Sequence, residues 1–396
     1  METEIKYIDN LCVKITDGSH FSPEDDEKGQ YPMYSVKDME YNSFSNQDCK
    51  HIGQDVFDKL SRQDCRPLKD DIVIAKDGSY LKYVFKVKED LDACILSSIA
   101  ILRPNKKVID PDYFVYLMRS ASVKNAMANY VSGSALPRII LSDFKKMKIA
   151  ICSDLNKQKH IASILSAYDS QIENNQKRIK LLEQMAENLY KEWFVRFRFP
   201  GYENAEFEGG VPKEWKQVTL GDYANVIMGQ SPESCFYNND KQGLPFHQGV
   251  GSYGDFYLQD DVYSTEGKRI AEANSIIFSV RAPVGRINIT LNRIILGRGV
   301  AGINAKNGNN AFLLWLLKNK FAKEDIIGNG AIFTSVTKDE LLGQKMLIPT
   351  KDIEESFNIL ASNIEKEIRF LTLQKDNLTH QRDLLLPRLM SGKLSI

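Results

Sequence analysis

One segment of this chain recurs about half a chain later. Residues 133–151 read GSALPRIILSDFKKMKIAI and residues 330–348 read GAIFTSVTKDELLGQKMLI. Both begin at a glycine, pass an acidic residue and a basic turn, and end in a short apolar run. Each is followed by a long segment with helical periodicity. Because an internal repeat is one structural unit used twice, we expect two copies of one fold.

Three further matches support this duplication. They are TDGSHFSP (16–23) with MGQSP (228–232), IVIAKDG (72–78) with IIFSVRA (276–282), and SSIA (97–100) with RGVA (298–301). In the first match Ser22 corresponds to Ser231. The sequence separation between matched residues shortens steadily along the chain, as loop-length differences between two copies would produce, whereas chance similarity would scatter.

Each copy is predicted to be a mixed α/β domain. Short β-branched and aromatic runs between clusters of Gly, Asn and Asp indicate strands. One helix is expected within each copy, at 111–128 and at 310–327, where apolar residues recur at helical spacing. The predicted domains cover residues 1–152 and 218–350.

A heptad seam follows each domain. Apolar residues alternate steps of three and four through 153–197 and again through 351–390, which is the pattern of coiled-coil helices. Two matched seams in one chain favour pairing of these helices with each other over two isolated, solvated helices. Asn175, Lys375 and Arg382 interrupt the seam, as polar residues that set register do. The predicted apolar seam residues are Leu165, Tyr168, Ile172, Ile179, Leu182, Leu189, Ile364, Ile368, Leu371, Leu378 and Leu385.

The linker at 198–217 indicates how the helices are oriented. A helix of about 40 residues is roughly 60 Å long. Parallel helices would therefore need an almost fully extended linker, at about 3.3 Å per residue. The linker instead contains Pro, Gly and aromatic residues typical of a compact turn. The sequence thus predicts an α+β protein in which an antiparallel coiled coil separates two similar domains with pseudo-twofold symmetry.

Charge and motifs limit the possible functions. The 52 Lys and Arg residues balance 52 Asp and Glu residues, which argues against nonspecific coating of nucleic acid. No segment has the apolar length of a membrane span, and the charged start is unlike a signal peptide, so we expect a cytoplasmic protein. The six cysteines form no Cys-x-x-Cys pair, which favours reduced thiols over disulfides or a zinc site.

Sequence motifs give no indication of catalysis. There is no adenine-methyltransferase Asn/Asp-Pro-Pro-Tyr/Phe tetrapeptide, no Walker A loop and no His-Glu-x-x-His spacing. GVGSYG at 249–254 fits Gly-x-Gly-x-x-Gly but does not lead from a strand into a helix, so a turn is favoured over a dinucleotide site. We therefore expect no catalytic residues and no metal site. Two similar domains on a rigid spacer suit a bipartite DNA target, because half-sites on one face of B-DNA lie about 34 to 36 Å apart.

Several segments resemble the target-recognition domains of type I restriction-modification specificity subunits. They are TDGSHFSP in the first copy, MGQSP with the following YN and FHQG, SVRAPVG and GRGVAGINA in the second copy, and the helical segments LLEQMAENLYKEWF and RDLLLPRLMSGKL. The resemblance spans essentially the whole chain. The first copy departs from the pattern, because Leu96, Ser97 and Ser98 stand where the second copy has Gly-Arg-Gly.

The resemblance implies a non-catalytic subunit that reads one half-site with each domain and directs adenine methylation or DNA cleavage by partners. The implied partners are double-stranded DNA, two modification (methyltransferase) subunits and restriction motor-nuclease subunits. S-adenosylmethionine, ATP and Mg would then be bound by the partners, and no cofactor by this chain. Two alternatives stay open: a specificity subunit of a methylation-only system, and a coiled-coil scaffold presenting two protein- or glycan-binding domains.

Loops rich in polar groups are the candidates for DNA contact. Arg and Lys read guanine edges and phosphates, while Asn, Gln, Ser and Thr read adenine edges or hold the backbone. For each residue the alternative is a structural role within a turn or between loops. The candidates are Asp17, Ser19, His20, Ser22, Lys76, Ser79 and Lys82 in the first domain, and Gln230, Ser231, Gln248, Arg281, Arg286 and Arg298 in the second.

Overall fold

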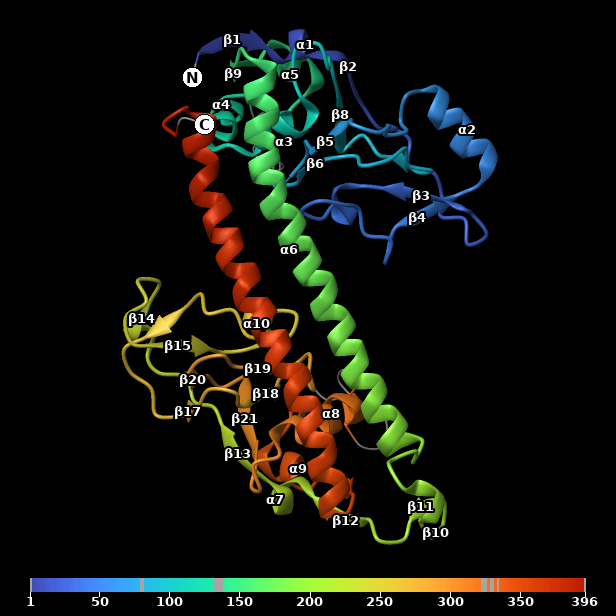
Figure 1. Cartoon of the computed structure of the whole chain (residues 1–396), viewed down its shortest axis with the longest axis vertical. Helices are drawn as coiled ribbons and strands as arrows, with labels where there is room; N and C mark the ends of the chain where they lie inside the picture. The colour runs from blue at the N-terminus through green and yellow to red at the C-terminus, as the bar shows by residue number, and fades with distance from the viewer. Residues whose placement is uncertain are drawn as a thin grey trace. The chain divides into compact units, whose positions relative to one another are not determined.

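The computed structural model comprises two compact units (Figure 1). The first contains Met1–Asn175 and Gln374–Ile396, and the second contains Gln176–Leu373. The predicted domains 1–152 and 218–350 each fall within one unit. Both units include part of the two long helices, α6 (Leu155–Tyr190) and α10 (Lys351–Met390). The structure describes residues 2–78, 82–130, 138–321, 326–327, 331–332 and 335–394.

The domain of the first unit is built from short strands and helices. Its strands are β1 (Thr3–Tyr7), β2 (Cys12–Asp17), β3 (Tyr31–Tyr34), β4 (Lys50–Ile52), β5 (Ile72–Ala75), β6 (Val84–Lys86), β7 (Cys94–Ile95), β8 (Ile99–Pro104) and β9 (Lys148–Cys152). Its helices are α1 (Ile8–Leu11), α2 (Gln54–Arg62), α3 (Pro111–Arg119), α4 (Ala121–Ala128) and α5 (Leu141–Lys146). The strands form an antiparallel sheet of order β2-β8-β5-β6, a second sheet of order β4-β3-β7, and a β1-β9 ribbon.

The domain of the second unit uses the same plan. Its strands are β10 (Phe207–Glu208), β11 (Val211–Pro212), β12 (Lys216–Thr219), β13 (Ala224–Met228), β14 (Tyr237–Asn238), β15 (Leu244–His247), β16 (Tyr263–Ser264), β17 (Ile270–Ala271), β18 (Ile276–Ser279), β19 (Ile287–Ile289), β20 (Ile294–Leu296), β21 (Val300–Ala305), β22 (Ile326–Ile327), β23 (Ala331–Ile332) and β24 (Lys345–Ile348). Its helices are α7 (Leu220–Tyr223), α8 (Asn310–Lys320) and α9 (Lys338–Leu342). The strands form an antiparallel sheet of order β13-β21-β18-β19, a larger sheet of order β14-β16-β15-β20-β17, and a β12-β24 ribbon.

Equivalent hydrogen bonds show that the two four-stranded sheets are copies. Gly18 N donates to Ile99 O at 3.3 Å in the first sheet, and Gly229 N donates to Val300 O at 3.0 Å in the second. Strands β2, β8, β5 and β6 therefore correspond to β13, β21, β18 and β19. The predicted α+β class and the duplication of one mixed domain are confirmed.

One of the sequence matches is wrong. Because Gly18 and Gly229 occupy equivalent positions, Ser231 corresponds to His20 and not to Ser22. Both segments contain a Ser-Pro dipeptide, but strand pairing and not this shared dipeptide fixes the register. The repeated segments 133–151 and 330–348 begin at residues 133 and 330, which lie outside the described residues.

The core of each domain lies between the four-stranded sheet and one helix. The central strands β5 and β18 have no exposed residue, which explains why they read as continuous apolar runs rather than alternating ones. Tyr113 and Phe114 of α3 are fully buried in the first unit, as are Phe312 and Leu317 of α8 in the second.

The two predicted internal helices need correction. The segment 111–128 is broken at Ser120, whose hydroxyl donates to Leu117 O at 2.6 Å and accepts from Val123 N at 3.4 Å. Ser120 thus ends α3 and caps α4, as local side-chain hydrogen bonding by serine favours. The segment 310–327 is helical only to Lys320, because Ile326–Ile327 forms β22.

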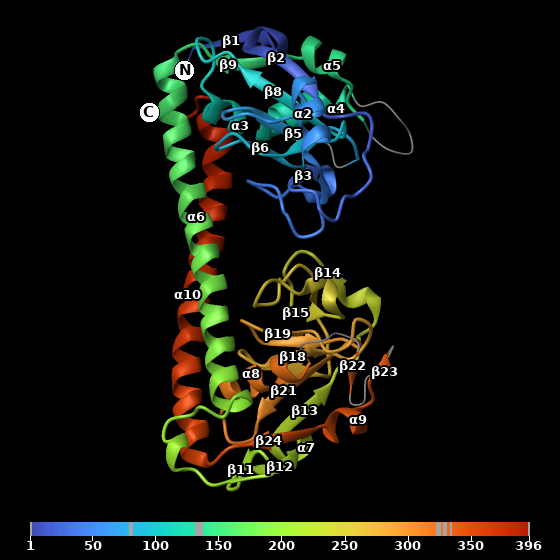
Figure 2. The same cartoon turned by 90° about the vertical axis from the view of Figure 1, so that its right-hand side faces the viewer.

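The long helices run antiparallel beside each other within the first unit (Figures 1 and 2). Arg382 Nη1 donates to Asp169 Oδ1 at 2.7 Å, and Asn175 Nδ2 donates to Gln374 Oε1 at 2.8 Å. Residue numbers rise along α6 as they fall along α10. The polar seam positions Asn175 and Arg382 are thus buried in hydrogen-bonded pairs that fix the register.

The second unit has the same antiparallel sense. Arg178 Nη2 donates to Glu367 Oε1 at 2.8 Å, and Tyr190 lies 5.8 Å from Phe357 between ring centroids. Every residue of the two predicted seams is buried or half-buried. The predicted antiparallel pairing of the helices is confirmed.

The ends of α6 differ slightly from the prediction of 153–197. The helix begins at Leu155 and ends at Tyr190, where a π-helical turn at Lys191–Val195 brings Trp193 and Phe194 into the core. Across the described residues, no helix combines the length and the apolar character needed to span a bilayer.

Candidate nucleic-acid interface

Three loops meet at one end of the four-stranded sheet of the first domain. Strand β2 ends at Asp17, and the loop that follows is bonded to the β7–β8 connection by Ser97 N, which donates to Ser19 O at 2.9 Å. The loop after β5 joins them because Lys76 N donates to Ser98 O at 3.0 Å. The sheet thus brings together the predicted DNA-contact residues at 17–22 and Lys76.

Asp17 and Lys76 form an ion pair inside this cluster. Lys76 Nζ lies 2.8 Å from Asp17 Oδ2, and the lysine side chain is only 2% exposed. A buried charge pair holds its loops in register but leaves neither charge available to a ligand. The structure therefore gives these two candidates a structural role.

Ser19 also has a structural role, whereas its neighbours are exposed. Its hydroxyl donates to Phe21 O at 2.6 Å and accepts from Phe21 N at 3.2 Å, which closes a tight turn. His20 has a side-chain exposure of 71%, and exposed Ser22 accepts a hydrogen bond from Lys50 Nζ at 3.1 Å. Phe21 between them is also exposed, and the prediction of polar DNA-contact residues does not include it.

The remaining candidates of the first domain follow β5. Lys82 is exposed, and its Nζ lies 5.1 Å from the ring centroid of Tyr83. Ser79 lies outside the described residues. Asp77 and Arg138 pair at 3.1 Å, which ties the loop after β5 to the segment preceding α5.

The second domain presents the equivalent loops with different side chains. Gln230 N donates to Leu296 O at 2.9 Å, and Arg298 N donates to Ser231 Oγ at 3.2 Å. Ser231 therefore holds the loop after β13 against the β20–β21 connection. Gln230 and Arg298 are both exposed.

Gln248, Arg281 and Arg286 add exposed polar groups to this domain. Gln248 follows β15, and its loop joins the cluster through Gly297 N, which donates to His247 O at 2.8 Å. Arg281 and Arg286 both lie in the connection between β18 and β19, and both are exposed. The second cluster is therefore richer in arginine than the first.

Buried His247 supports the loop that carries Gln248. Its ring nitrogens lie 2.8 Å from Ser252 Oγ and 2.9 Å from Asp260 Oδ1. Burial alone would raise the pKa of Asp260, but hydrogen bonds from His247 and Asn292 hold it below its usual value. The charged form of Asp260 is thus favoured, which strengthens its contact with the histidine.

A glycine is required at the same place in both clusters. A Cβ atom on Gly18 would lie 2.1 Å from Ile95 O, and one on Gly229 would lie 2.1 Å from Gly297 O. No side chain fits such an approach, so the glycines permit the loops to pass close to the neighbouring strand.

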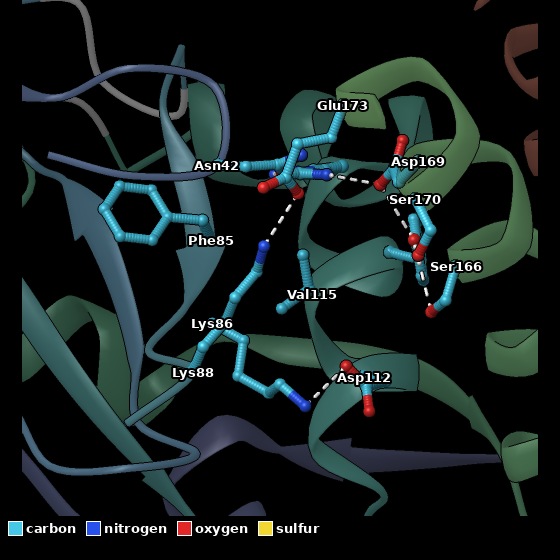
Figure 3. Close-up of a pocket in the computed structure, with 12 residues that line it drawn as sticks. Asn42, Phe85, Lys86, Lys88, Asp112, Val115, Ser166, Asp169, Ser170 and Glu173 are labelled. Carbon is cyan, nitrogen blue, oxygen red and sulfur yellow. Dashed lines mark hydrogen bonds and ion pairs between the residues drawn. The ribbon is translucent and has the colours of Figure 1, made fainter. Parts of the chain in front are cut away.

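A cavity of about 170 Å³ marks the joint between the first domain and α6 (Figure 3). Figure 3 shows Lys88 reaching Glu173 of α6 and Lys86 reaching Asp112 of α3, each at 2.7 Å. The acidic groups are occupied by lysines of the same domain. The cavity therefore belongs to a structural joint rather than to the loop cluster.

A stacked cation cluster completes this joint. The guanidinium carbons of Arg119 and Arg382 lie 4.1 and 4.8 Å from the ring centroid of Tyr41. Both arginines also contact Asp169, at 3.4 and 2.7 Å, and Tyr116 donates to it at 2.8 Å. Asp169 thus ties α3 and α10 to α6.

The second unit has a different charge arrangement beside α8. Lys318 Nζ lies 4.3 Å from the ring centroid of Phe256 and 4.9 Å from that of Trp315. Burial lowers the pKa of Lys318. Burial also raises the pKa of Glu365 to about 7, although Trp315 and Lys318 oppose this rise. A half-buried carboxyl group on α10 therefore lacks the strong pairing that Asp169 has on α6.

Comparison with known proteins agrees with this architecture. A family model for the type I restriction modification DNA specificity domain matches residues 2–184 and 212–378. The chain is 31% identical over 307 residues to the putative type I restriction enzyme MjaX specificity subunit of Methanocaldococcus jannaschii, covering 76% of this chain and 72% of the relative. It is 23% identical over 392 residues to the type I restriction enzyme HindI specificity subunit of Haemophilus influenzae, covering 79% and 84%.

A solved structure has the same fold. The crystal structure of a type I restriction-modification S subunit from M. genitalium aligns with a TM-score of 0.64 and 16% identity, covering 98% of this chain and 96% of that one.

Proposed function

Because the chain belongs to the family of type I restriction-modification specificity subunits and has two recognition domains, we propose that each domain reads one half of a bipartite DNA target. The chain would thereby direct adenine methylation or DNA cleavage by partner subunits. The observation that carries this proposal is the repeated loop cluster. One backbone framework appears twice and presents different exposed side chains each time, which is what reading two different half-sites requires.

The exposed side chains have the chemistry of base and phosphate contact. In the second domain, Arg281 and Arg298 suit guanine edges or phosphates, and Gln230 and Gln248 suit adenine edges. In the first domain, His20 and Ser22 flank the loop tip, while Lys82 supplies a positive charge. We expect polar readout to be stronger in the second half-site, because bidentate Arg and Gln contacts discriminate bases best.

We propose that partner subunits supply the chemistry and much of the affinity. The modification subunits, two in number, would bind S-adenosylmethionine, and restriction motor-nuclease subunits would use ATP and Mg, with no cofactor in this chain. A balanced charge gives few phosphate contacts and a small counterion-release term. Exposed apolar side chains on the long helices, Leu181, Met185, Phe370 and Leu384, offer docking surface for these subunits.

Methylome sequencing with and without this gene tests the proposal. Loss of the gene should abolish one bipartite methylated motif. Replacing residues 218–350 with the corresponding domain of a relative should then change one half-site and leave the other unchanged. A swap that alters both half-sites together would contradict the assignment of one half-site to each domain. Plasmid restriction in the same strains separates a complete restriction system from a methylation-only one.

A further inference from the structure

The loop that follows β2 is fixed on both sides of its tip. Asp17 is held by Lys76 before the tip, and Ser19 N donates to Ile95 O at 2.9 Å. After the tip, Lys50 Nζ donates to Pro23 O at 3.1 Å. Contacts within the domain therefore hold this loop in one conformation.

The residue held at the tip is Phe21, whose side chain is 72% exposed. The Ser19 hydroxyl bonds both the N–H and the carbonyl of Phe21, so the backbone beneath the ring is fixed. Exposed His20 and Ser22 flank it. A single exposed apolar residue needs no explanation by itself. An aromatic residue whose backbone is fixed within a polar loop cluster is a different case, because the point from which its ring projects is set before any partner arrives.

The second domain shows what this position holds in the other copy. The equivalence of Gly18 with Gly229 places Pro232 where the first domain has Phe21. Pro232 is half-buried, and its carbonyl accepts a hydrogen bond from Tyr237 Oη at 2.9 Å. The second domain therefore presents Gln230 and Arg298 around a recessed proline, whereas the first presents a projecting ring.

We propose that Phe21 reads the first half-site through apolar contact with its bases, while the second half-site is read through polar contacts. This inference rests on the proposed function. A phenyl ring offers no hydrogen bond, so it can contact DNA bases in two ways. It can pack against the C5-methyl group of a thymine in the major groove, or it can stack on a base or wedge between base steps. Both are apolar contacts that a rigid ring makes with little loss of conformational entropy.

Binding by the full chain assembled with its modification subunits provides the test. Fluorescence anisotropy would measure affinity for the native target and for duplexes altered in either half-site. Phe21→Ala should weaken binding to the native target by about tenfold, the size of losing one base–aromatic contact. It should also reduce discrimination in the first half-site and leave that in the second unchanged. Ile5→Ala is the matched control, because Ile5 on β1 is 73% exposed but lies outside the loop cluster.

Modified bases distinguish the two modes of contact. If Phe21 packs on a thymine methyl group, uracil at one first-half position should cost wild type about fourfold in affinity and cost Phe21→Ala nothing. If the ring stacks on a base or wedges between base steps, the fluorescence of 2-aminopurine placed in the first half-site should rise when wild type binds. With Phe21→Ala it should stay quenched. Phe21→Leu should retain most of the affinity if the ring packs on a methyl group or wedges between base steps, and lose it if the ring stacks on a base.

The results that would overturn the inference are distinct from those that would overturn the proposed function. If the wild-type complex showed no preference for a bipartite target, the proposed function would be wrong. Suppose instead that the wild type is sequence-specific and that Phe21→Ala and Phe21→Leu both bind as Ile5→Ala does. This result would overturn only the role of Phe21. An equal loss of discrimination in both half-sites would do the same, because it would indicate a general loss of binding.

Discussion

In the first recognition domain Lys76 and Asp17 form a buried ion pair, whereas the equivalent positions of the second domain hold Val280 and Met228. The backbone around them is the same in both. Lys76 N and Val280 N each donate to the carbonyl of the β7–β8 or β20–β21 connection at 3.0 Å. We call these two positions the floor of the loop cluster: Asp17 and Lys76 in the first domain, Met228 and Val280 in the second. The backbone of the cluster therefore keeps its geometry whether the floor is charged or apolar.

A second pair of positions gives the same lesson. Arg103 donates to Asp71 through two hydrogen bonds of 2.8 Å in the first domain, and the equivalent Asn304 donates to Ser275 at 3.0 Å in the second. A charged pair and a neutral one occupy one site on the framework. Backbone pairing and the two close-approach glycines define the fold, so side-chain chemistry was free to diverge between the copies.

The largest effect is expected when the charged floor is half removed. Lys76→Val removes the buried lysine from the Asp17 carboxylate and leaves it only the exposed His20, whose Nε2 lies 3.4 Å from Asp17 Oδ1. This change should lower the free energy of unfolding by about 3–5 kcal/mol. Adding Asp17→Met reproduces the second domain and should recover most of this loss. Urea unfolding of the full chain, followed by circular dichroism, measures both. A double variant as unstable as Lys76→Val would show that the floors are not interchangeable.

The close-approach glycines should be needed equally in both domains. Gly18→Ala and Gly229→Ala each place a Cβ against a carbonyl oxygen, and we expect each to cost about 3 kcal/mol of stability through overpacking. Gly249→Ala is the control, since no atom lies within 4 Å of its Cβ position. Thermal unfolding would measure all three variants. A tolerated alanine at either glycine would break the structural equivalence of the loops.

The two domains should also differ in DNA binding, with a free-energy difference smaller than the stability effects above. Arg298→Ala removes an exposed guanidinium of the second cluster and should cost about 2 kcal/mol in binding free energy, confined to the second half-site. Ser97→Ala, at the equivalent position of the first domain, should change little. Anisotropy titrations with duplexes mutated in one half-site would measure this difference. Equal losses for both variants would mean that this position does not distinguish the domains.

The smallest expected effect concerns pH. Because the folded pKa of Glu365 is raised to about 7, the folded state binds this proton more tightly than the unfolded state does. Stability therefore falls as pH rises from near 4.5 to 7, by at most about 3 kcal/mol for a shift of this size. Because Glu365 is only half-buried, solvent screening reduces this effect, and we expect Glu365→Gln to be about 1 kcal/mol more stable than wild type at pH 8. Glu355→Gln, on the same helix, is the control, because the Glu355 side chain is 49% exposed and only a surface contact with Lys351 is altered. The difference from wild type at pH 8 should vanish at pH 5 in chemical unfolding experiments.

Periodic features of the sequence predicted most of the fold. The heptad seams and the duplicated segments were visible because coiled-coil pairing and strand patterning leave regular traces. The break at Ser120 was missed because a serine that caps a helix looks the same in sequence as a serine within one. The burial of Lys76 depends on an acidic partner from another strand, which no local pattern reveals. Phe21 was missed because polar residues alone were considered as readers.

The composition of the two units has a consequence for the order of assembly during synthesis. The first unit requires residues 374–394, and Leu389 of this segment is buried in the same core as Leu165. The ribosome therefore releases every residue of the second unit before the first can be completed. Until then, the apolar face that α10 will cover on the first domain stays open to water and to chaperones. The domain that emerges first is thus the last to close, and a pause in translation after Leu373 would leave it exposed.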